Sequence, residues 1–161
     1  MLAIRTILHP TDLSPLSGCA FRLACSLARD HGARLIVLFV NPPDVLLADS
    51  PYLPPPDPAQ IWERLQDELE MLQSLDPTVV VEHVLKEGNP AEEILRTAQD
   101  TGCDLIVMGT HGRTGVRRLL MGSVAEHILR KAACPVLTVK MPVAMAESLQ
   151  KGAAQDLVKT S

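Results

Sequence analysis

The chain has 161 residues, of which 47% are hydrophobic, 21% are charged and 2% are aromatic, and its formal net charge is −4 at pH 7. This length fits one domain with a full hydrophobic core, which the composition predicts to be aliphatic. The acidic balance and the scarcity of aromatic residues argue against nucleic acid as a partner, and no apolar stretch is long enough to span a membrane.

Strand and helix patterns alternate along the chain, with β-branched or continuous apolar runs separated by apolar residues at helical spacing. In chain order the pattern predicts a strand at 3–9, a helix at 15–31, a strand at 34–40, a helix at 58–75, a strand at 78–85, a helix at 88–102, a strand at 104–109, a helix within 119–133 and a strand at 135–140. Such alternation predicts an α/β fold with a five-stranded parallel sheet and helices on both faces.

Local signals set the expected boundaries of these elements. Pro10 is expected to stop the first strand, and Asp12 or Ser14 to cap the first helix, which Gly32 ends. Asn89 is the expected cap of the third helix, with Pro90 in its first turn. The proline-rich stretch 41–58 is expected to form a rigid loop.

Four cysteines occur, and none lies in a C-x-x-C pair or near a histidine at zinc-finger spacing. Reduced thiols in a cytoplasmic protein are therefore expected. Arg5 interrupts the first apolar run, so no signal peptide is expected either.

Glycines are concentrated between the fourth strand and the last helix, where Gly109, Gly112, Gly122 and Ser123 form the pattern G-x2-G-x9-G-S. Glycine lets a ligand approach the main chain closely, and exposed amides beside a helix start bind anions. The pattern is not a P-loop, because serine rather than lysine follows the last glycine, and it lacks the G-x-G of the Rossmann fingerprint.

Two groups of residues bear on whether these glycines bind a ligand: one has a purely structural explanation, and the other could contact a ligand. Ser123 and Glu126 have the spacing of a capping box, which would explain the serine without a ligand. Thr11, Asp12 and Ser14 follow the first strand, at the same edge of the sheet as the glycines. A carboxylate there could accept hydrogen bonds from a ribose or an amino group.

Three segments, ILHPTDLS (7–14), GTHGRTGVRRLLMGSVAEHIL (109–129) and CPVLTVK (134–140), resemble the universal stress protein family. The resemblance covers residues 3–140 and includes the G-x2-G-x9-G-S signature of the ATP-binding branch. We therefore expect one universal stress protein domain at 1–140, followed by a C-terminal tail at 141–161. It implies the strand order 3-2-1-4-5 and a homodimer that pairs through the last strand, residues 135–140.

The same resemblance implies a binding site for ATP. Adenine would lie among Pro10, Thr11, Asp12 and Val40, and the ribose against Met108 and Gly109. The phosphates would be surrounded by His111, Gly112, Gly122, Ser123 and Val124. Mg²⁺ or Mn²⁺ would be coordinated mainly by these phosphates, without a protein metal site.

Three functions are compatible with these residues. The protein could be a nucleotide-dependent regulator in stress response, a slow ATPase or self-phosphorylating enzyme assisted by Asp12 or His111, or a nucleotide-free dimeric scaffold. No lysine or second carboxylate completes a catalytic site, which favours binding over catalysis. The intact glycine signature argues against the scaffold.

Overall fold

The computed structural model describes residues 3–14, 17–43, 57–74, 76–110 and 122–140. Its elements in chain order are β1 (Thr6–Thr11), α1 (Gly18–His31), β2 (Arg34–Asn41), α2 (Pro58–Glu70), β3 (Val81–Glu87), α3 (Pro90–Asp100), β4 (Leu105–Gly109), α4 (Ser123–Lys131) and β5 (Val136–Val139). The tail at 141–161 and most of the proline-rich stretch, 44–56, lie outside the described residues.

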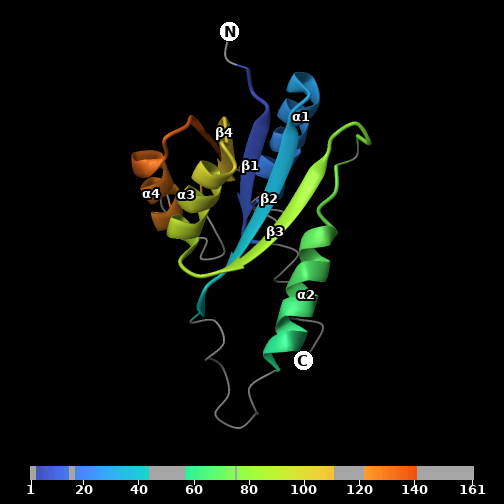
Figure 1. Ribbon diagram of the computed structural model, residues 1–161, viewed down its shortest axis with the longest axis vertical. Helices are drawn as coiled ribbons and strands as arrows, with labels where there is room; N and C mark the ends of the chain where they lie inside the picture. Colours follow the sequence, from blue (N-terminus) through green and yellow to red (C-terminus); the bar gives the residue numbers. More distant parts are fainter. Residues whose placement is uncertain (1–2, 15–16, 44–56, 75, 111–121, 141–161) are drawn as a thin grey trace, which may run out of the picture.

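The five strands form one parallel sheet in the order β3-β2-β1-β4-β5, which confirms the predicted fold. Figure 1 shows α1 and α2 on one face of this sheet and α3 and α4 on the other. β1 is central, and the chain order reverses between β1 and β4. A doubly wound sheet binds ligands at such a switch point, beyond the carboxyl ends of its strands.

Successive residues of the strands pack into two separate aliphatic cores. Ile7, Leu35 and Val37 pack toward α1 and α2, whereas Leu8, Ile36 and Leu38 pack toward α3 and α4. All six side chains are fully buried. Both faces of the central strands are therefore covered, which explains the continuous apolar run of β2.

β1 continues through Pro10 to Thr11, so the prediction that the proline stops this strand was wrong. The amide and the carbonyl of Thr6 both bond to Asp104 on the β4 side, at 3.0 and 2.9 Å. Backbone N–H and C=O groups alternate in direction along a strand, so the backbone nitrogen of Pro10 also faces β4. Pairing between β1 and β4 ends at Leu8, and the missing N–H of Pro10 therefore costs the sheet no hydrogen bond.

Helix ends follow the local signals in part. Gly32 ends α1 in the left-handed conformation, with φ of 60°, and the side chain of Asn89 caps α3 by accepting from the amides of Ala91 and Glu92, so both predictions are confirmed. α1 itself begins three residues later than predicted. Its N-cap is Ser17, whose side chain makes no capping bond, so neither Asp12 nor Ser14 caps the helix.

β3 begins later than its β-branched sequence predicts. Asp76 accepts hydrogen bonds from the amide and hydroxyl of Thr78, and the amide of Val79 bonds to the carbonyl of Asp76. This turn uses the first residues of the predicted strand, and the ladder starts only at Val81. α2 ends at Glu70, with Met71 as its C-cap, rather than at residue 75.

Candidate functional site

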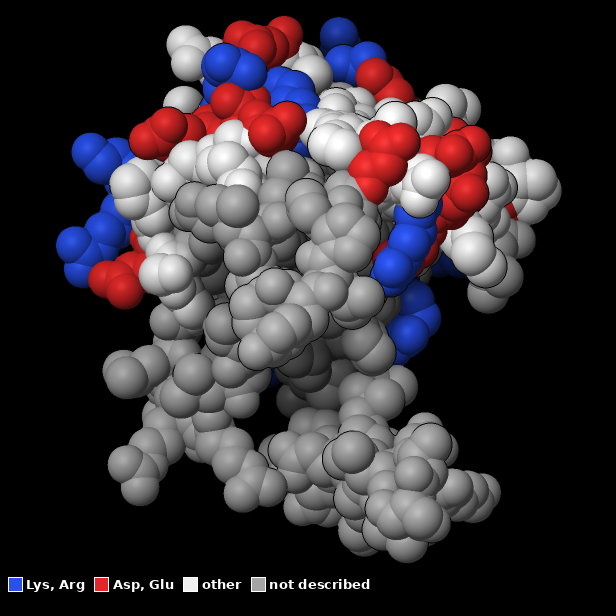
Figure 2. Space-filling model, turned by 90° about the horizontal axis from the view of Figure 1, so that it is seen from below, with Lys and Arg blue, Asp and Glu red and all other residues white. Residues whose placement is uncertain are grey.

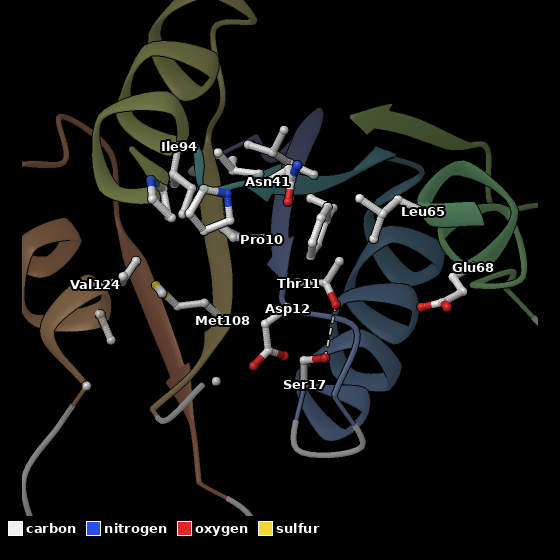
Figure 3. Close-up of a pocket in the computed structure, with 18 of the residues that line it drawn as sticks. Pro10, Thr11, Asp12, Ser17, Asn41, Leu65, Glu68, Ile94, Met108 and Val124 are labelled. Carbon is white, nitrogen blue, oxygen red and sulfur yellow. Dashed lines mark hydrogen bonds between the residues drawn. The ribbon is translucent and has the colours of Figure 1, made fainter. Parts of the chain in front are cut away.

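A cavity of about 550 Å³ opens at the carboxyl ends of β1, β2 and β4. Figure 3 shows Val124 and Met108 on one side of it, Leu65 and Glu68 of α2 on the other, and the end of β1 between them. The volume is in the range of small-molecule and cofactor sites. The cavity lies where β1 and β4 separate, which is the switch point of the sheet.

The turn after β1 is held in an uncommon conformation. Leu13 has a φ of 61°, which costs a non-glycine residue about 1–3 kcal/mol. Its amide donates to the hydroxyl of Thr11, and that hydroxyl lies 3.0 Å from the hydroxyl of Ser17 at the start of α1. The strained turn is thus locked by side chains that also line the cavity.

Asp12 uses only one of its carboxylate oxygens in this turn. Oδ1 accepts from the amide and the hydroxyl of Ser14, at 3.1 and 2.6 Å. Oδ2 is buried and has no hydrogen-bond partner in the part of the chain that the structure describes. A buried acceptor without a partner is costly, and its position in the wall of the cavity points to a ligand that donates to it.

β2 contributes Val40 and Asn41 from its carboxyl end. The side chain of Val40 belongs to the core beneath α3 and α4. Asn41 is 4% exposed, and its Nδ2 is a second buried polar atom that lacks a partner among the described residues. The end of β2 therefore brings an unpaired donor to the same cavity that holds the unpaired acceptor of Asp12.

The last helix presents its amino end to the cavity. The N-cap of α4 is Gly122, which makes no side-chain capping bond, so the capping box predicted from Ser123 and Glu126 does not form. The amide of Gly122 donates to the carbonyl of Thr110, at 2.8 Å, which ties this end to β4. The first-turn residues from Gly122 to Ala125 line the cavity. The amides of Ser123, Val124 and Ala125 and the helix dipole favour an anion there.

The structure brings most of the predicted site residues together. Nine of the eleven line the cavity: Pro10, Thr11, Asp12, Val40, Met108, Gly109, Gly122, Ser123 and Val124. His111 and Gly112 lie outside the described residues. The nine come from three strand ends and one helix start, which is the arrangement expected for ligand binding at a switch point.

One wall of the cavity was missed by the sequence analysis. α2 contributes Ile61, Arg64, Leu65 and Glu68 to the lining. The guanidinium Nε of Arg64 donates to Glu68 at 2.9 Å on the exposed side of this helix. Apolar spacing revealed the helix, but it gave no sign that α2 borders a ligand cavity, because that depends on how the helix packs beside β2 and β3.

His9 is a buried polar residue next to the cavity. It is 0% exposed, its Nδ1 lies 2.8 Å from the carbonyl of Val107, and its ring packs against Phe21 with centroids 5.6 Å apart. Burial lowers the pKa of His9 to about 4, against smaller raising effects of the bond to Val107 and of the charge of Asp12. The ring is therefore neutral near pH 7, and Nδ1 donates to Val107.

Neither a metal cluster nor a membrane helix occurs in the described part of the chain. No three His, Cys, Asp or Glu side chains there are grouped to hold a metal ion. No described helix has the length and apolar character needed to cross a bilayer. On the face seen in Figure 2, the described basic and acidic side chains are intermixed around the rim and do not form a single basic patch.

The sheet order, the crossovers and the cavity together define a doubly wound α/β protein with a cavity at its switch point. Residues 3–140 match the model of the universal stress protein family. The chain therefore belongs to the universal stress protein family.

Individual relatives agree with this assignment. Universal stress protein MJ0531 of Methanocaldococcus jannaschii is 36% identical over 148 residues, covering 86% of this chain and 83% of the relative. Among solved structures, protein MJ0577 superposes with a TM-score of 0.75 at 27% identity, covering 88% of this chain and 99% of the other.

Two further structures share the fold and hold adenine nucleotides. A universal stress protein in complex with cAMP superposes with a TM-score of 0.60 at 23% identity, covering 87% of this chain and 99% of the other. The Archaeoglobus fulgidus universal stress protein in complex with dAMP has a TM-score of 0.56 at 22% identity, covering 87% and 100%. At these identities the similarity to this chain is one of fold.

Proposed function

We propose that this protein binds ATP or a closely related adenine nucleotide in the cavity at the ends of β1, β2 and β4, and acts as a nucleotide-dependent regulator in stress response. The observation that carries the proposal is the cavity itself. It combines an unpaired acceptor on Asp12, an unpaired donor on Asn41 and a helix start without a side-chain cap. Adenine nucleotides in two proteins of the same fold support the choice of ligand class.

The assignment of subsites follows the distribution of polar groups. The base lies against Pro10, Thr11 and Val40, where apolar surface adjoins the strained turn of Asp12. The phosphates lie at the start of α4, beside Gly122, where the lining residues Ser123 and Val124 provide amides and no side-chain cap competes for them. Met108 and Gly109 lie between, on the ribose side, and His111 and Gly112 complete the phosphate site by resemblance.

A divalent cation fits this site only through the nucleotide. The described cavity wall offers the carboxylates of Asp12 and Glu68, and no group of three ligating side chains is present in the described residues. Mg²⁺ or Mn²⁺ would therefore be coordinated mainly by the phosphates, whose charge it would neutralise. Asp12 and the amides of α4 would bind and orient the nucleotide.

A homodimer through β5 is part of the same proposal. Among the described strands β5 pairs with β4 alone, which leaves its other edge open there, and Leu137 in its middle is 38% exposed. An open apolar edge favours pairing with another strand. We infer a cytoplasmic location from the cysteine pattern of the sequence.

The direct test is binding by the full chain. Native mass spectrometry of the gently purified protein should show a mass increment of an adenine nucleotide. Thermal shift should show a higher melting temperature with ATP than without it, because a ligand that binds only the folded state stabilises it. Binding of neither ATP, AMP nor cyclic AMP at millimolar concentration would contradict the proposal.

A further inference from the structure

The side chain of Asn41 lies on the α2 side of the cavity. Along β2, Leu38 and Val40 pack into the core beneath α3 and α4, whereas Phe39 packs into the core beneath α1 and α2. Side chains alternate between the faces of a strand, so Asn41 shares the face of Phe39. Figure 3 shows it between Pro10 and Leu65, at the edge of the sheet that faces the cavity.

The side-chain amide of Asn41 donates no hydrogen bond within the described part of the chain. The backbone carbonyl of Asn41 accepts from the amide of Gly88, at 3.1 Å, and any residue could supply that carbonyl. Asn41 is 4% exposed, and its Nδ2 has no hydrogen-bond partner in the described residues. A buried donor without a partner destabilises the folded chain, and an apolar residue of similar shape would remove that penalty.

The surroundings of this amide match a flat heteroaromatic ligand. Phe39, Ile61 and Leu65 supply apolar lining to the same cavity, and Asp12 offers its unpaired Oδ2 there. The ligand must then present a hydrogen-bond acceptor to Asn41 and a donor to Asp12. An aminopurine has both at its edges, as ring nitrogens with in-plane lone pairs and an exocyclic amino group.

We propose that Asn41 is a specificity-determining residue of this site, and that its Nδ2 donates a hydrogen bond to a ring nitrogen of the bound purine. This inference rests on the proposed function and deepens it. The nucleobase is thereby recognised by a side chain at the end of β2, in addition to the residues around Pro10 and Val40. In the nucleotide-free protein the side-chain amide of Asn41 has no partner among the described residues, which destabilises the folded chain but leaves this donor available to the ligand.

Two isosteric substitutions test the role of the amide. Asn41→Leu keeps the shape but removes the polar group, and Asn41→Asp keeps an acceptor but removes the donor. Both variants should bind ATP about 10- to 100-fold more weakly in titration calorimetry, because each loses a buried hydrogen bond to the ligand. Gln66→Leu is the matched control, because it makes the same change at an exposed amide of α2 that donates to Glu70.

The nucleotide-free protein provides a readout that a structural role would not produce. Asn41→Leu should raise its melting temperature by about 2 °C or more, since it removes an unsatisfied buried donor. A structural amide would give the opposite result, with a lower melting temperature and unchanged nucleotide affinity. That combination would overturn the inference.

Deaza analogues of ATP identify the acceptor. Wild-type protein is titrated with ATP and with its 1-deaza, 3-deaza and 7-deaza analogues, each of which replaces one ring nitrogen by C–H. One analogue should bind the wild type about 10-fold more weakly than ATP does, whereas Asn41→Leu should bind that analogue and ATP equally.

The outcomes separate the inference from the proposed function. If the wild type binds no adenine nucleotide, the proposed function fails, and the role of Asn41 fails with it. If the wild type binds ATP and Asn41→Leu binds it with the same affinity, only the role of Asn41 is refuted. If every deaza analogue binds the wild type as tightly as ATP does, the hydrogen bond to a ring nitrogen is refuted.

Discussion

The Nδ1 of His9 lies 2.8 Å from the carbonyl oxygen of Val107, and this hydrogen bond joins β1 to β4 just beyond their last backbone pair, Leu8 with Ile106. From this point the two strands separate toward the cavity. The bond is fully buried, so it holds the two sides of the switch point together where the backbone ladder has ended. His9 thus supports the site without lining it.

This arrangement predicts a specific loss of stability in acid. Burial lowers the pKa of His9 to about 4 from 6.5, so the unfolded chain binds a proton more readily than the folded one. The contribution of neutral His9 to the stability of the folded state is fully present above pH 6.5 and is lost as the pH falls toward 4. The loss amounts to about 3 kcal/mol of unfolding free energy.

Urea unfolding at several pH values between 7 and 4 measures this contribution. His9→Gln does not titrate in this range and can still donate to Val107, so its stability should fall less steeply than that of the wild type. Subtracting the unfolding free energy of the variant from that of the wild type at each pH cancels the contribution of the carboxylates, because these titrate in both proteins. Equal slopes for the two proteins would show that His9 is not held neutral by burial.

A side chain at Gly122 should weaken nucleotide binding without disrupting the fold. Gly122 has a φ of −60° and a ψ of 147°, which other residues adopt readily, so its backbone does not require glycine. Gly122→Val would crowd the amides at the start of α4 and should weaken ATP binding at least about 10-fold, at little cost in melting temperature.

The control for this variant is Gly18→Val at the start of α1. A Cβ added at Gly18 meets no other atom nearer than 3.9 Å, and Gly18 does not line the cavity. Its ATP affinity in titration calorimetry should equal that of the wild type. If Gly122→Val bound ATP as tightly as this control, the phosphates would have to lie away from α4.

A proline at Thr138 should block pairing through β5. The carbonyl of Pro135 accepts from Ile106 of β4, and that of Val139 accepts from Thr110 just after β4. The backbone groups of Val136 and Thr138 therefore point to the open edge. Thr138→Pro therefore removes a donor from the open edge and keeps the ladder to β4.

Analytical ultracentrifugation at a concentration where the wild type is dimeric checks the prediction. Thr138→Pro should sediment as a monomer, whereas Thr138→Val, which retains the amide, should remain dimeric. A dimer of the proline variant with unchanged affinity would place the interface elsewhere on the molecule.

Cys103 should resist alkylation in the folded protein. It is buried, its thiol donates to the carbonyl of Leu105, and burial, together with the neighbouring Cys134, raises its pKa to about 12. Only the thiolate reacts, so the raised pKa lowers the reactive fraction of this thiol. Iodoacetamide labelling followed by peptide mass spectrometry should show Cys103 unmodified in native protein and modified in urea. Labelling at equal rates in both states would contradict this assignment.

Sequence patterns were sufficient to predict which helices and strands occur and how they are connected. Each helix has apolar residues at helical spacing, and signals such as Asn89 and Gly32 act within one turn, so they need no distant partner. Strand-helix alternation favours right-handed crossovers, and the family resemblance supplied the strand order. The nine described residues predicted for the site meet in one cavity because they all belong to strand ends or to the following helix start.

Other features depended on contacts between segments far apart in the chain. Pro10 stays in β1 because β4 has already separated at that point, and α4 takes Gly122 as its cap because the amide of Gly122 is bonded to Thr110. Asn41 follows six apolar residues, and only packing reveals that its side-chain amide is buried and lacks a partner among the described residues. The sequence by itself determined the periodicity and the helix ends at Gly32 and Asn89, because these involve neighbours within a few residues. Which polar atoms are left unpaired in the cavity was decided by the tertiary structure, since that depends on every segment packed around them.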